Sequence, residues 1–540
     1  MPTSCIPPRH RARRAARRPA AARPLPPAPL AAGRALPARR RRAARRAAAQ
    51  SLPAPARPAP VPRGGRGITL AVVLCAQLMI VLDMTVVNVA LPSIAHGLHL
   101  SAPGLAWVLN AYSLTFGGLL LLGGRAGDIL GRRTVFLAGV AIFTAASLAG
   151  GLATSAAALL AARAVQGAGG AIASPAVLAT IASSFPGERE RARALGAFTA
   201  VSTGGGSLGL ILGGIITQWA SWRLVLFVNV PVGIAVVIAG RRLLPRSARR
   251  PGRFDLAGAL TSTAGVSALV YGFIRAASDG WSDRVTLAAF AAAGALLTAF
   301  VAVEARSAEP VTPLRLFADR SRSASYGVRM LLVGGMFGMF FFLTQFVQEV
   351  LRFSPLRAGL AFVPMTVTLF AVSRLAPRLL ARFGSKALMV AGSVPVIAAM
   401  AWLTRITPAT SYLPGIAGPM VLFGAGVGLA LVPLAMASLA GVRPADSGAA
   451  ASMVNVTQQV GGALGLAILV TVFGAAARVA GASRGAPRTA AGPGERAHLL
   501  ARAVAASFGT ALAFDVLALL VILLAISVTG QPAAVPAAES

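Results

Sequence analysis

Charged side chains inside long apolar runs are the residues of this chain best suited to chemistry. Asp83 lies within an apolar run that begins near residue 68, and Arg163 lies within another that begins near residue 155. A charge at the centre of a membrane helix costs roughly 2.5–3.5 kcal/mol on insertion scales. A nearby arginine favours the ionised carboxylate, whereas burial without that contact favours the protonated acid. We therefore expect Asp83 to bind and release a proton as its distance from Arg163 changes.

The positions of these two residues within their runs suggest that they meet. Asp83 comes eight residues before Leu91, and Arg163 comes eight residues after Ser155. At 1.5 Å per helical residue, both lie about 12 Å below the same membrane face. The pair could couple protons, or it could only lock two helices together. Asp515, near the middle of the last run, has no obvious partner, so it is either a second titrating group or a residue facing a water-filled crevice.

Apolar runs long enough to cross a bilayer recur along nearly the whole chain. Hydrophobic residues make up 56% of it and charged residues only 12%. About 20 helical residues cross the hydrocarbon core, and lipid accepts only helices or closed barrels. We therefore predict an all-α polytopic membrane protein with fourteen transmembrane helices, near residues 68–91, 104–123, 134–152, 155–180, 195–217, 223–240, 255–274, 285–303, 325–348, 357–374, 386–403, 413–436, 448–473 and 504–528.

The residue patterns of nucleotide-driven and metal-dependent sites are missing from the sequence. A phosphate-binding loop needs Gly-Lys followed by Ser or Thr, but the one lysine, Lys386, lies between Ser385 and Ala387. His96 and His99 are spaced i,i+3 without a neighbouring Cys, Asp or Glu, so we expect no metal site there. We therefore expect no enzyme activity and no cofactor, and an ion gradient must drive any uphill step.

The net charge of +36 is unevenly distributed. Residues 1–67 hold seventeen arginines and no acid, in an Arg/Pro/Ala tail without apolar periodicity. This tail is either a disordered segment or the product of a misplaced start in a GC-rich bacterial gene. The remaining loops follow the positive-inside rule, which puts both termini in the cytoplasm. This distribution predicts a multi-pass protein of the bacterial inner membrane, with lipid rather than nucleic acid as its partner.

The segment Gly124–Phe136, GRAGDILGRRTVF, is a short charged hinge between the second and third runs. Glycine lets helix ends approach closely, and the acid and bases can bridge neighbouring helix ends. The segment resembles the loop between helices two and three of the major facilitator superfamily, whose pattern is G-x-L-A-D-R-x-G-R-R, although Ala126 and Ile129 depart from it. The resemblance implies a conformational hinge made by Gly124, Asp128, Gly131, Arg132 and Arg133.

Two pairs of similar segments recur at nearly the same offset. GRRTVFLAG at 131–139 matches GSKALMVAG at 384–392, 253 residues later, and GGSLGLIL at 205–212 matches GGALGLAI at 461–468, 256 residues later. These offsets indicate two six-helix halves in parallel orientation, the repeat relation of major facilitator transporters. We expect a tail at 1–67, an N-terminal half at 68–242, a two-helix insert at 243–303, a cytoplasmic loop at 304–323, a C-terminal half at 324–530 and a C-terminal tail at 531–540.

Four further segments indicate one branch of that superfamily. They are LDMTVVNVALP at 82–92, RAVQGAG at 163–169, SWRLVLFVNVPVG at 221–233 and NVTQQVGGALG at 455–465. Together they resemble the drug:proton antiporters with fourteen transmembrane helices, over about residues 68–530. The resemblance implies a central cavity that couples protons and substrate, with Asp83, Arg163, Gln166 and Asn455 among its residues.

Small residues in the fifth and thirteenth runs predict close helix packing. They are Gly205, Gly209, Gly213, Gly214, Gly461 and Gly465. Leu210 departs from the family, whose fifth-helix pattern has a proline there. The missing proline removes a bend point and weakens the case for strict antiport.

The predicted function is export of amphipathic or cationic compounds in exchange for protons, by alternating access and as a monomer. A cationic substrate would compete with the proton for Asp83. The aromatic run that includes Phe337 and Phe340 is either ordinary packing or a face for apolar drugs. Two alternatives remain open: a dedicated exporter of one endogenous metabolite or antibiotic, and a membrane sensor or scaffold that transports nothing. The insertion cost of the buried charges favours transport.

Overall fold

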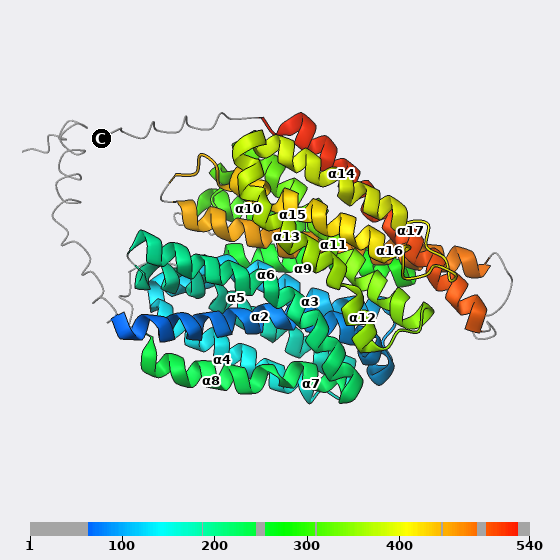
Figure 1. The fold of residues 1–540 in the computed structure, drawn as a ribbon, viewed down its shortest axis with the longest axis horizontal. Coiled ribbons are helices and arrows are strands. Elements are labelled where there is room, and N and C mark those ends of the chain that lie inside the picture. The colour runs from blue at the N-terminus through cyan, green and yellow to red at the C-terminus, as the bar shows by residue number, and fades with distance from the viewer. Residues whose placement is uncertain are drawn as a thin grey trace, which may run out of the picture. The chain divides into compact units, whose positions relative to one another are not determined.

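The computed structural model describes residues 63–185, 187–244, 254–307, 310, 312–443, 446–482 and 493–527, and these form helices and connections without strands. In chain order the helices are α2 (Arg63–Leu98), α3 (Ala102–Leu130), α4 (Arg132–Gly151), α5 (Ala156–Ser184), α6 (Glu188–Trp219), α7 (Trp222–Phe227), α8 (Asn229–Leu243), α9 (Leu256–Asp279), α10 (Arg284–Arg306), η1 (Leu314–Phe317), α11 (Arg320–Gln345), η2 (Phe346–Val350), α12 (Pro355–Ala361), α13 (Val363–Phe383), α14 (Ser385–Leu403), α15 (Ala417–Leu439), α16 (Ser447–Ala482) and α17 (Pro493–Ala525) (Figure 1).

Fourteen helical segments in the described part of the chain are long and apolar enough to cross a membrane, which confirms the predicted number of spans. Several continue beyond the predicted run, because the apolar pattern marks only the part embedded in hydrocarbon. α2 begins at Arg63 rather than near residue 68, and Arg66 donates a hydrogen bond of 2.8 Å to Glu190 of α6. Residues 1–62 of the predicted tail at 1–67, and the predicted tail at 531–540, lie outside the described residues.

Two of the predicted spans consist of two α-helices each. The sixth span changes from α7 to α8 at Val228, and the tenth changes from α12 to α13 at Phe362. Pro231 and Pro364 follow these breaks within the first turn of the next helix, where a missing N–H costs little. The first break lies directly before Asn229, which takes part in the site described below.

Helix contacts in the two six-helix halves correspond pair by pair. In the N-terminal half, α2 packs on α6 and α8, and α5 packs on α3 and α4. In the C-terminal half, α11 packs on α16 and α17, and α15 packs on α13 and α14. The insert packs through α9 on one helix of each half, α3 and α16, and α10 packs on α9. The architecture is therefore the predicted one, two parallel repeats and a two-helix insert.

Glycine allows the first and fifth helices of each half to approach closely. A Cβ added at Gly213 of α6 would lie 2.7 Å from the backbone oxygen of Val86 on α2. A Cβ added at Gly461 of α16 would lie 2.5 Å from the Cα of Met330 on α11. The same close approach to α2 or α11 occurs at Gly205, Gly209 and Gly465. The glycine stripes thus occupy equivalent places in the two repeats.

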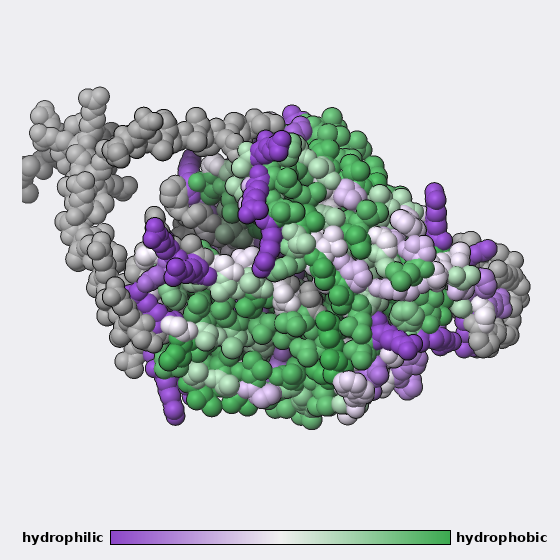
Figure 2. Space-filling view, viewed as in Figure 1, coloured by the Kyte–Doolittle hydropathy of each residue, from purple (hydrophilic) through white to green (hydrophobic). Residues whose placement is uncertain are grey.

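Hydrophobic side chains cover much of the outer surface of the helices. Figure 2 shows them over the middle of the bundle, with hydrophilic residues mostly toward the helix ends. The insert contributes strongly to this surface, because Leu260 of α9 and Leu287 of α10 are 61% and 55% exposed. Side chains of this kind are stable against lipid chains, which fits a multi-pass membrane protein.

Candidate functional site

Asp83 of α2 and Arg163 of α5 form a buried ion pair. The Nη1 of Arg163 donates to Oδ2 of Asp83 at 2.5 Å, and the two side chains are 1% and 0% exposed respectively. The structure thus brings together the two intramembrane charges that stand at matching depth in the sequence. An ion pair this deeply buried needs further hydrogen bonds to offset the loss of water.

Two amide side chains supply those further bonds. The other oxygen of Asp83, Oδ1, accepts hydrogen bonds from Nε2 of Gln166 at 2.7 Å and from Nδ2 of Asn229 at 2.9 Å. Gln166 lies one turn after Arg163 on α5, and its Oε1 accepts from Arg163 at 2.6 Å. Its Nε2 also donates to Ser147 of α4 at 2.7 Å. Three helices, α2, α5 and α8, therefore meet at one carboxylate, and α4 is linked to it through Gln166.

Arg163 is held from a further helix. Its Nε donates to the backbone oxygen of Val108 on α3 at 3.1 Å, and its guanidinium lies 4.5 Å from the ring centroid of Tyr112, a cation–π contact. The aromatic face and the carbonyl fix the plane of the guanidinium. Its direction toward Asp83 is therefore set by α3 as well as by α5.

Sequence reasoning selected Asp83, Arg163 and Gln166 but missed Asn229 and Ser147. A signal existed for Asn229, since it is an amide in the apolar segment SWRLVLFVNVPVG that carried the family resemblance. Ser147 gave no comparable signal, because a serine among alanines and glycines is common in closely packed membrane helices.

The arrangement matches Asp83 in its ionised form. As a carboxylate, Asp83 accepts from three donors, and its charge is matched by Arg163. A proton on either oxygen would remove that charge and turn an acceptor into a donor facing other donors, so at least one partner would have to move. Because the Asp83 side chain is 0% exposed, it has no room for a substrate cation in this conformation.

Asp515 of α17 does not belong to this cluster. It is 0% exposed, and neither of its carboxyl oxygens has a hydrogen-bond partner among the described residues. It faces Gly335 of α11, where an added Cβ would lie 3.5 Å from Oδ1. Asn455 of α16 also lies apart: it is exposed and bonds only to Ala451 of its own helix, at 3.5 Å.

The predicted hinge connects α3 to α4 and contacts two other helices. Gly131, between them, has a φ of 95°, which favours glycine. Arg132 lies 3.5 Å from Asp128 and donates to the backbone oxygen of Ala179 on α5 at 3.3 Å. Arg133 donates to the backbone oxygen of Arg241 on α8. Gly124 packs beside Pro175 of α5, where an added Cβ would be 3.7 Å away. This end of the bundle is called the hinge end below.

The two halves touch at the end opposite the hinge. Gln348 of η2 donates to the backbone oxygen of Val89 on α2 at 3.0 Å, and the backbone nitrogen of Leu356 on α12 donates to Gln218 of α6 at 3.2 Å. Gly214 belongs to this contact rather than to the α2 stripe, since an added Cβ would lie 2.8 Å from the Cα of Leu356. Backbone of one half therefore lies directly against the other half there.

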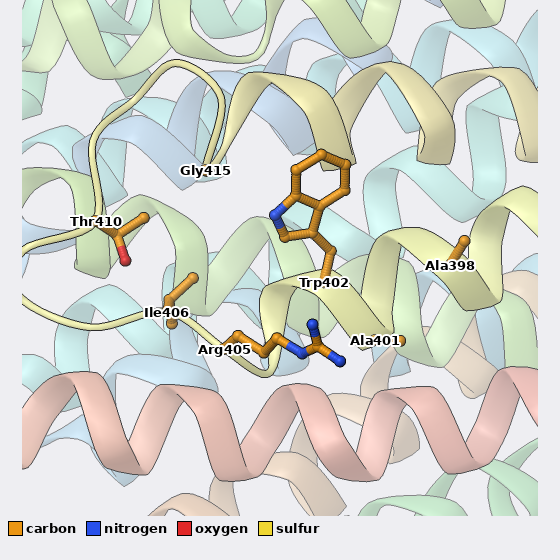
Figure 3. A pocket seen from close by; sticks show the side chains of 7 residues that line it. All are labelled: Ala398, Ala401, Trp402, Arg405, Ile406, Thr410 and Gly415. Carbon is orange, nitrogen blue, oxygen red and sulfur yellow. The ribbon is translucent and has the colours of Figure 1, made fainter.

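A surface pocket lies away from the ion pair, in the C-terminal half (Figure 3). Trp402 comes from the end of α14, and Arg405, Thr410 and Gly415 come from the connection to α15. The pocket shares no residue with the Asp83 cluster, which α2 to α8 supply. It therefore adds nothing to the buried charge network.

Comparisons with known proteins agree with this geometry. The model of the Major Facilitator Superfamily matches residues 73–466. The cephamycin export protein CmcT of Amycolatopsis lactamdurans is 44% identical over 406 residues, 74% of this chain and 83% of that protein. The puromycin resistance protein pur8 of Streptomyces alboniger is 44% identical over 408 residues, 75% of this chain and 81% of that protein. The multidrug resistance protein Stp of Mycobacterium tuberculosis is 33% identical over 398 residues, 74% of each chain.

Solved structures show the same fold at much lower identity. A bacterial homologue of the human lysosomal transporter Spinster, in an inward-facing unoccupied conformation, has a TM-score of 0.60 and 17% identity, and covers 86% of this chain and 98% of that one. A D-xylose–proton symporter has a TM-score of 0.57 and 15% identity, and covers 85% of this chain and 98% of that one.

Proposed function

Because this chain belongs to the major facilitator superfamily, we propose that it exports amphipathic or cationic small molecules across the bacterial inner membrane in exchange for protons. The relatives named above are described as export and resistance proteins, which supports export as the direction of transport. Both termini lie in the cytoplasm in this proposal, so the hinge end faces the cytoplasm. The protein works as a monomer.

The observation that carries the proposal is the enclosed ion pair of Asp83 and Arg163. A carboxylate and a guanidinium in a membrane interior are costly to insert, and removing one of two such partners leaves an uncompensated charge. A proton on Asp83 creates that imbalance reversibly. The protein can relieve it by moving α2 relative to α5 or α8, because each of these helices supplies contacts to Asp83.

The contacts between the halves support an assignment of this conformation to the state that is closed to the outside. The halves are joined by hydrogen bonds at the end opposite the hinge. With the hinge end in the cytoplasm, these contacts close the route to the outside. Protonation of Asp83 from the outside requires that they open, so the proton and the change of access are linked. The hinge would hold α3, α4, α5 and α8 as one body during this movement.

A dedicated exporter of one compound is the second candidate. The word "export" beside a single antibiotic in the name of one relative favours it, whereas "multidrug resistance" in the name of another favours a broad exporter. A membrane sensor or scaffold would gain nothing from the insertion cost of the pair. Transport of several substrates of unrelated structure by the wild-type protein would favour the multidrug exporter.

Proton release on substrate binding tests the coupling. Purified full-length protein in weakly buffered detergent solution near neutral pH would be mixed with ethidium, and the released protons would be measured with a pH indicator. We expect release from the wild type and none from Asp83→Asn. Asp279→Asn serves as a matched control, because Asp279 is an exposed residue at the end of α9. Equal release from the wild type and Asp83→Asn would exclude Asp83 as the coupling group and make Asp515 the next candidate.

A further inference from the structure

Arg329 of α11 is a buried cation that the mechanism above does not use. Its side chain makes one hydrogen bond, from Nη2 to Oε1 of Gln458 on α16, at the long distance of 3.5 Å. Its Nε and Nη1 are buried without a hydrogen-bond partner in the described part of the chain. Arg163, by contrast, has a carboxylate, and Arg322 donates to two backbone oxygens. Arg329 is therefore the least satisfied of these three buried guanidinium groups.

An unsatisfied guanidinium is costly inside a membrane protein. Arginine remains charged and presents five N–H donors, so burial without an acceptor loses both hydration and hydrogen bonds. Arg329 is 7% exposed. The fold therefore leaves a buried cation with spare donors, which is the state expected of a site whose anionic partner arrives from outside the chain.

Asp515 does not act as this partner in the present conformation. It lies against Gly335, on the side of α11 that faces α17, whereas Arg329 reaches Gln458 on α16. Six residues separate Arg329 from Gly335, and they point about 120° apart around a helix with 3.6 residues per turn. The two groups are not within ion-pair distance of each other in the described structure.

Apolar side chains continue from Arg329 along the same face of α11. Met336 and Phe340 follow at i+7 and i+11, the spacing of one helical face. Both are only partly buried. The ring of Phe340 lies 5.3 Å from that of Phe362, at the junction of α12 and α13. A cation at one end of an apolar strip matches a molecule with an anionic group at one end and an apolar body.

We propose that Arg329 binds an anionic group, foremost a carboxylate, of the transported amphipathic molecule. Arg329 offers its spare donors, the amide nitrogen of Gln458 offers another, and Met336 and Phe340 contact the apolar body. A carboxylate suits the planar fork of a guanidinium, which binds it through two parallel hydrogen bonds. The proposal rests on the proposed export function and adds amphipathic carboxylates, including zwitterions, to its substrates.

A pair of dyes that differ in one carboxylate tests this site. Rhodamine B carries a free carboxylate, and its ethyl ester has the same cationic ring system with that group blocked. Binding to full-length protein in lipid nanodiscs would be followed by fluorescence anisotropy. Arg329→Gln should weaken rhodamine B binding about tenfold, the scale of one lost hydrogen bond between charged groups, and leave ester binding unchanged. Arg329→Lys should weaken rhodamine B binding less, since lysine keeps the positive charge although it lacks the planar guanidinium.

Arg284→Gln is the matched control, because Arg284 is an exposed arginine at the start of α10 in the insert. It should leave the binding of both dyes unchanged. The anion site would be excluded if Arg329→Gln weakened the binding of both dyes equally, or weakened the binding of neither. Failure of the wild type to bind rhodamine B would also exclude it. If the wild type fails to bind rhodamine B but exports the ester when driven by protons, the proposed function stands and only the anion site is excluded. If the wild type binds both dyes but transports neither, the proposed export function is contradicted and the anion site is not.

Thermal unfolding separates a binding role from a structural one. Removing a buried charge that lacks a partner should stabilise the empty protein, so Arg329→Gln should unfold at a higher temperature than the wild type without dye. Rhodamine B should raise the unfolding temperature of the wild type but not of the variant. A lower unfolding temperature for the empty variant would show that Arg329 supports the fold and would overturn the proposal.

Discussion

Asn229 of α8 donates to the same carboxylate oxygen of Asp83 that Gln166 of α5 holds. One acidic side chain thereby joins the first, fourth and sixth helices of the N-terminal half. The corresponding first and sixth helices of the C-terminal half, α11 and α17, have no such link through Asp515, which faces Gly335. The helix packing of the halves corresponds, but their buried charges are held differently, so the two halves are suited to different tasks.

Loss of the Asn229 amide should destabilise the N-terminal half. Asn229→Leu keeps the branched shape of the side chain but removes a hydrogen bond to a charged acceptor, at a cost of about 1.5–3 kcal/mol. Asn88→Leu on α2 is the matched control, because Asn88 is also a buried amide but bonds only to Met84 of its own helix. Thermal unfolding in detergent would compare the two. A larger loss in Asn88→Leu would contradict the role given to Asn229.

The fold could be predicted from the sequence because lipid leaves few alternatives. Each apolar run had to be a helix, and the repeated glycine segments at 205–212 and 461–468 lie at equivalent helix contacts in the two halves. The helix ends could not be predicted as well. Arg66 shows the reason: its bond to Glu190 lies in the first turn of α2, in a part that has no apolar pattern.

The site could be predicted only where a residue was conspicuous by its charge. Asp83 and Arg163 stood out because charges are rare in apolar runs, and their depth followed from counting residues. The rotation of each helix about its own axis, which decides which neighbour its polar side chains face, could not be obtained by counting residues. For that reason the contact of Asn229 with Asp83 was missed, and the distance of Asn455 from that cluster was not foreseen.

Neutralising the hinge acid should slow transport without lowering protein level. Asp128 lies 3.5 Å from Arg132, and the two side chains are 43% and 32% exposed, so their pair adds little stability. Asp128→Asn should therefore reach the membrane at nearly the wild-type level but export ethidium much more slowly. Immunoblotting and dye efflux from the same cells would measure both. Efflux at the wild-type rate would remove Asp128 from the mechanism.

The stability contributed by the ion pair between Arg315 of η1 and Asp446, just before α16, should decrease at low pH. Arg315 donates to both oxygens of Asp446, at 2.8 and 2.6 Å, and these bonds lower the pKa of Asp446. A lowered pKa in the folded state gives stability that is complete above the unfolded pKa, about 3.9, and is lost as the pH falls through the folded pKa. The difference in unfolding temperature between wild type and Asp446→Asn should thus be constant from pH 8 to about 5 and shrink below pH 4.

Arg315→Gln should reproduce the effect of Asp446→Asn, because it breaks the same two bonds. Asp279→Asn, at an exposed helix end where Asp279 lies 3.7 Å from Arg275, is the control for a general effect of acid on the protein. A difference between wild type and Asp446→Asn that stays unchanged down to pH 3 would show that the two bonds do not stabilise the folded protein.

Joining the two halves at the end opposite the hinge should stop transport. Gln218 of α6 and Leu356 of α12 are in hydrogen-bond contact across the halves. The variant Gln218→Cys/Leu356→Cys, in a background with Cys5 and Cys75 replaced by serine, would be treated with a short reducible bifunctional thiol reagent. If export needs these ends to separate, the reagent should abolish ethidium efflux, and a reductant should restore it.

Ser321 and Ser527 provide a control cross-link within one half. Their hydroxyl oxygens are 2.9 Å apart, on α11 and just after the end of α17, both in the C-terminal half. The variant Ser321→Cys/Ser527→Cys should react with the same reagent and keep its efflux, since the two positions move together in a rigid half. Full efflux by the cross-linked Gln218/Leu356 variant, with the cross-link verified by mass spectrometry, would show that these ends stay together during transport and would rule out alternating access through this contact.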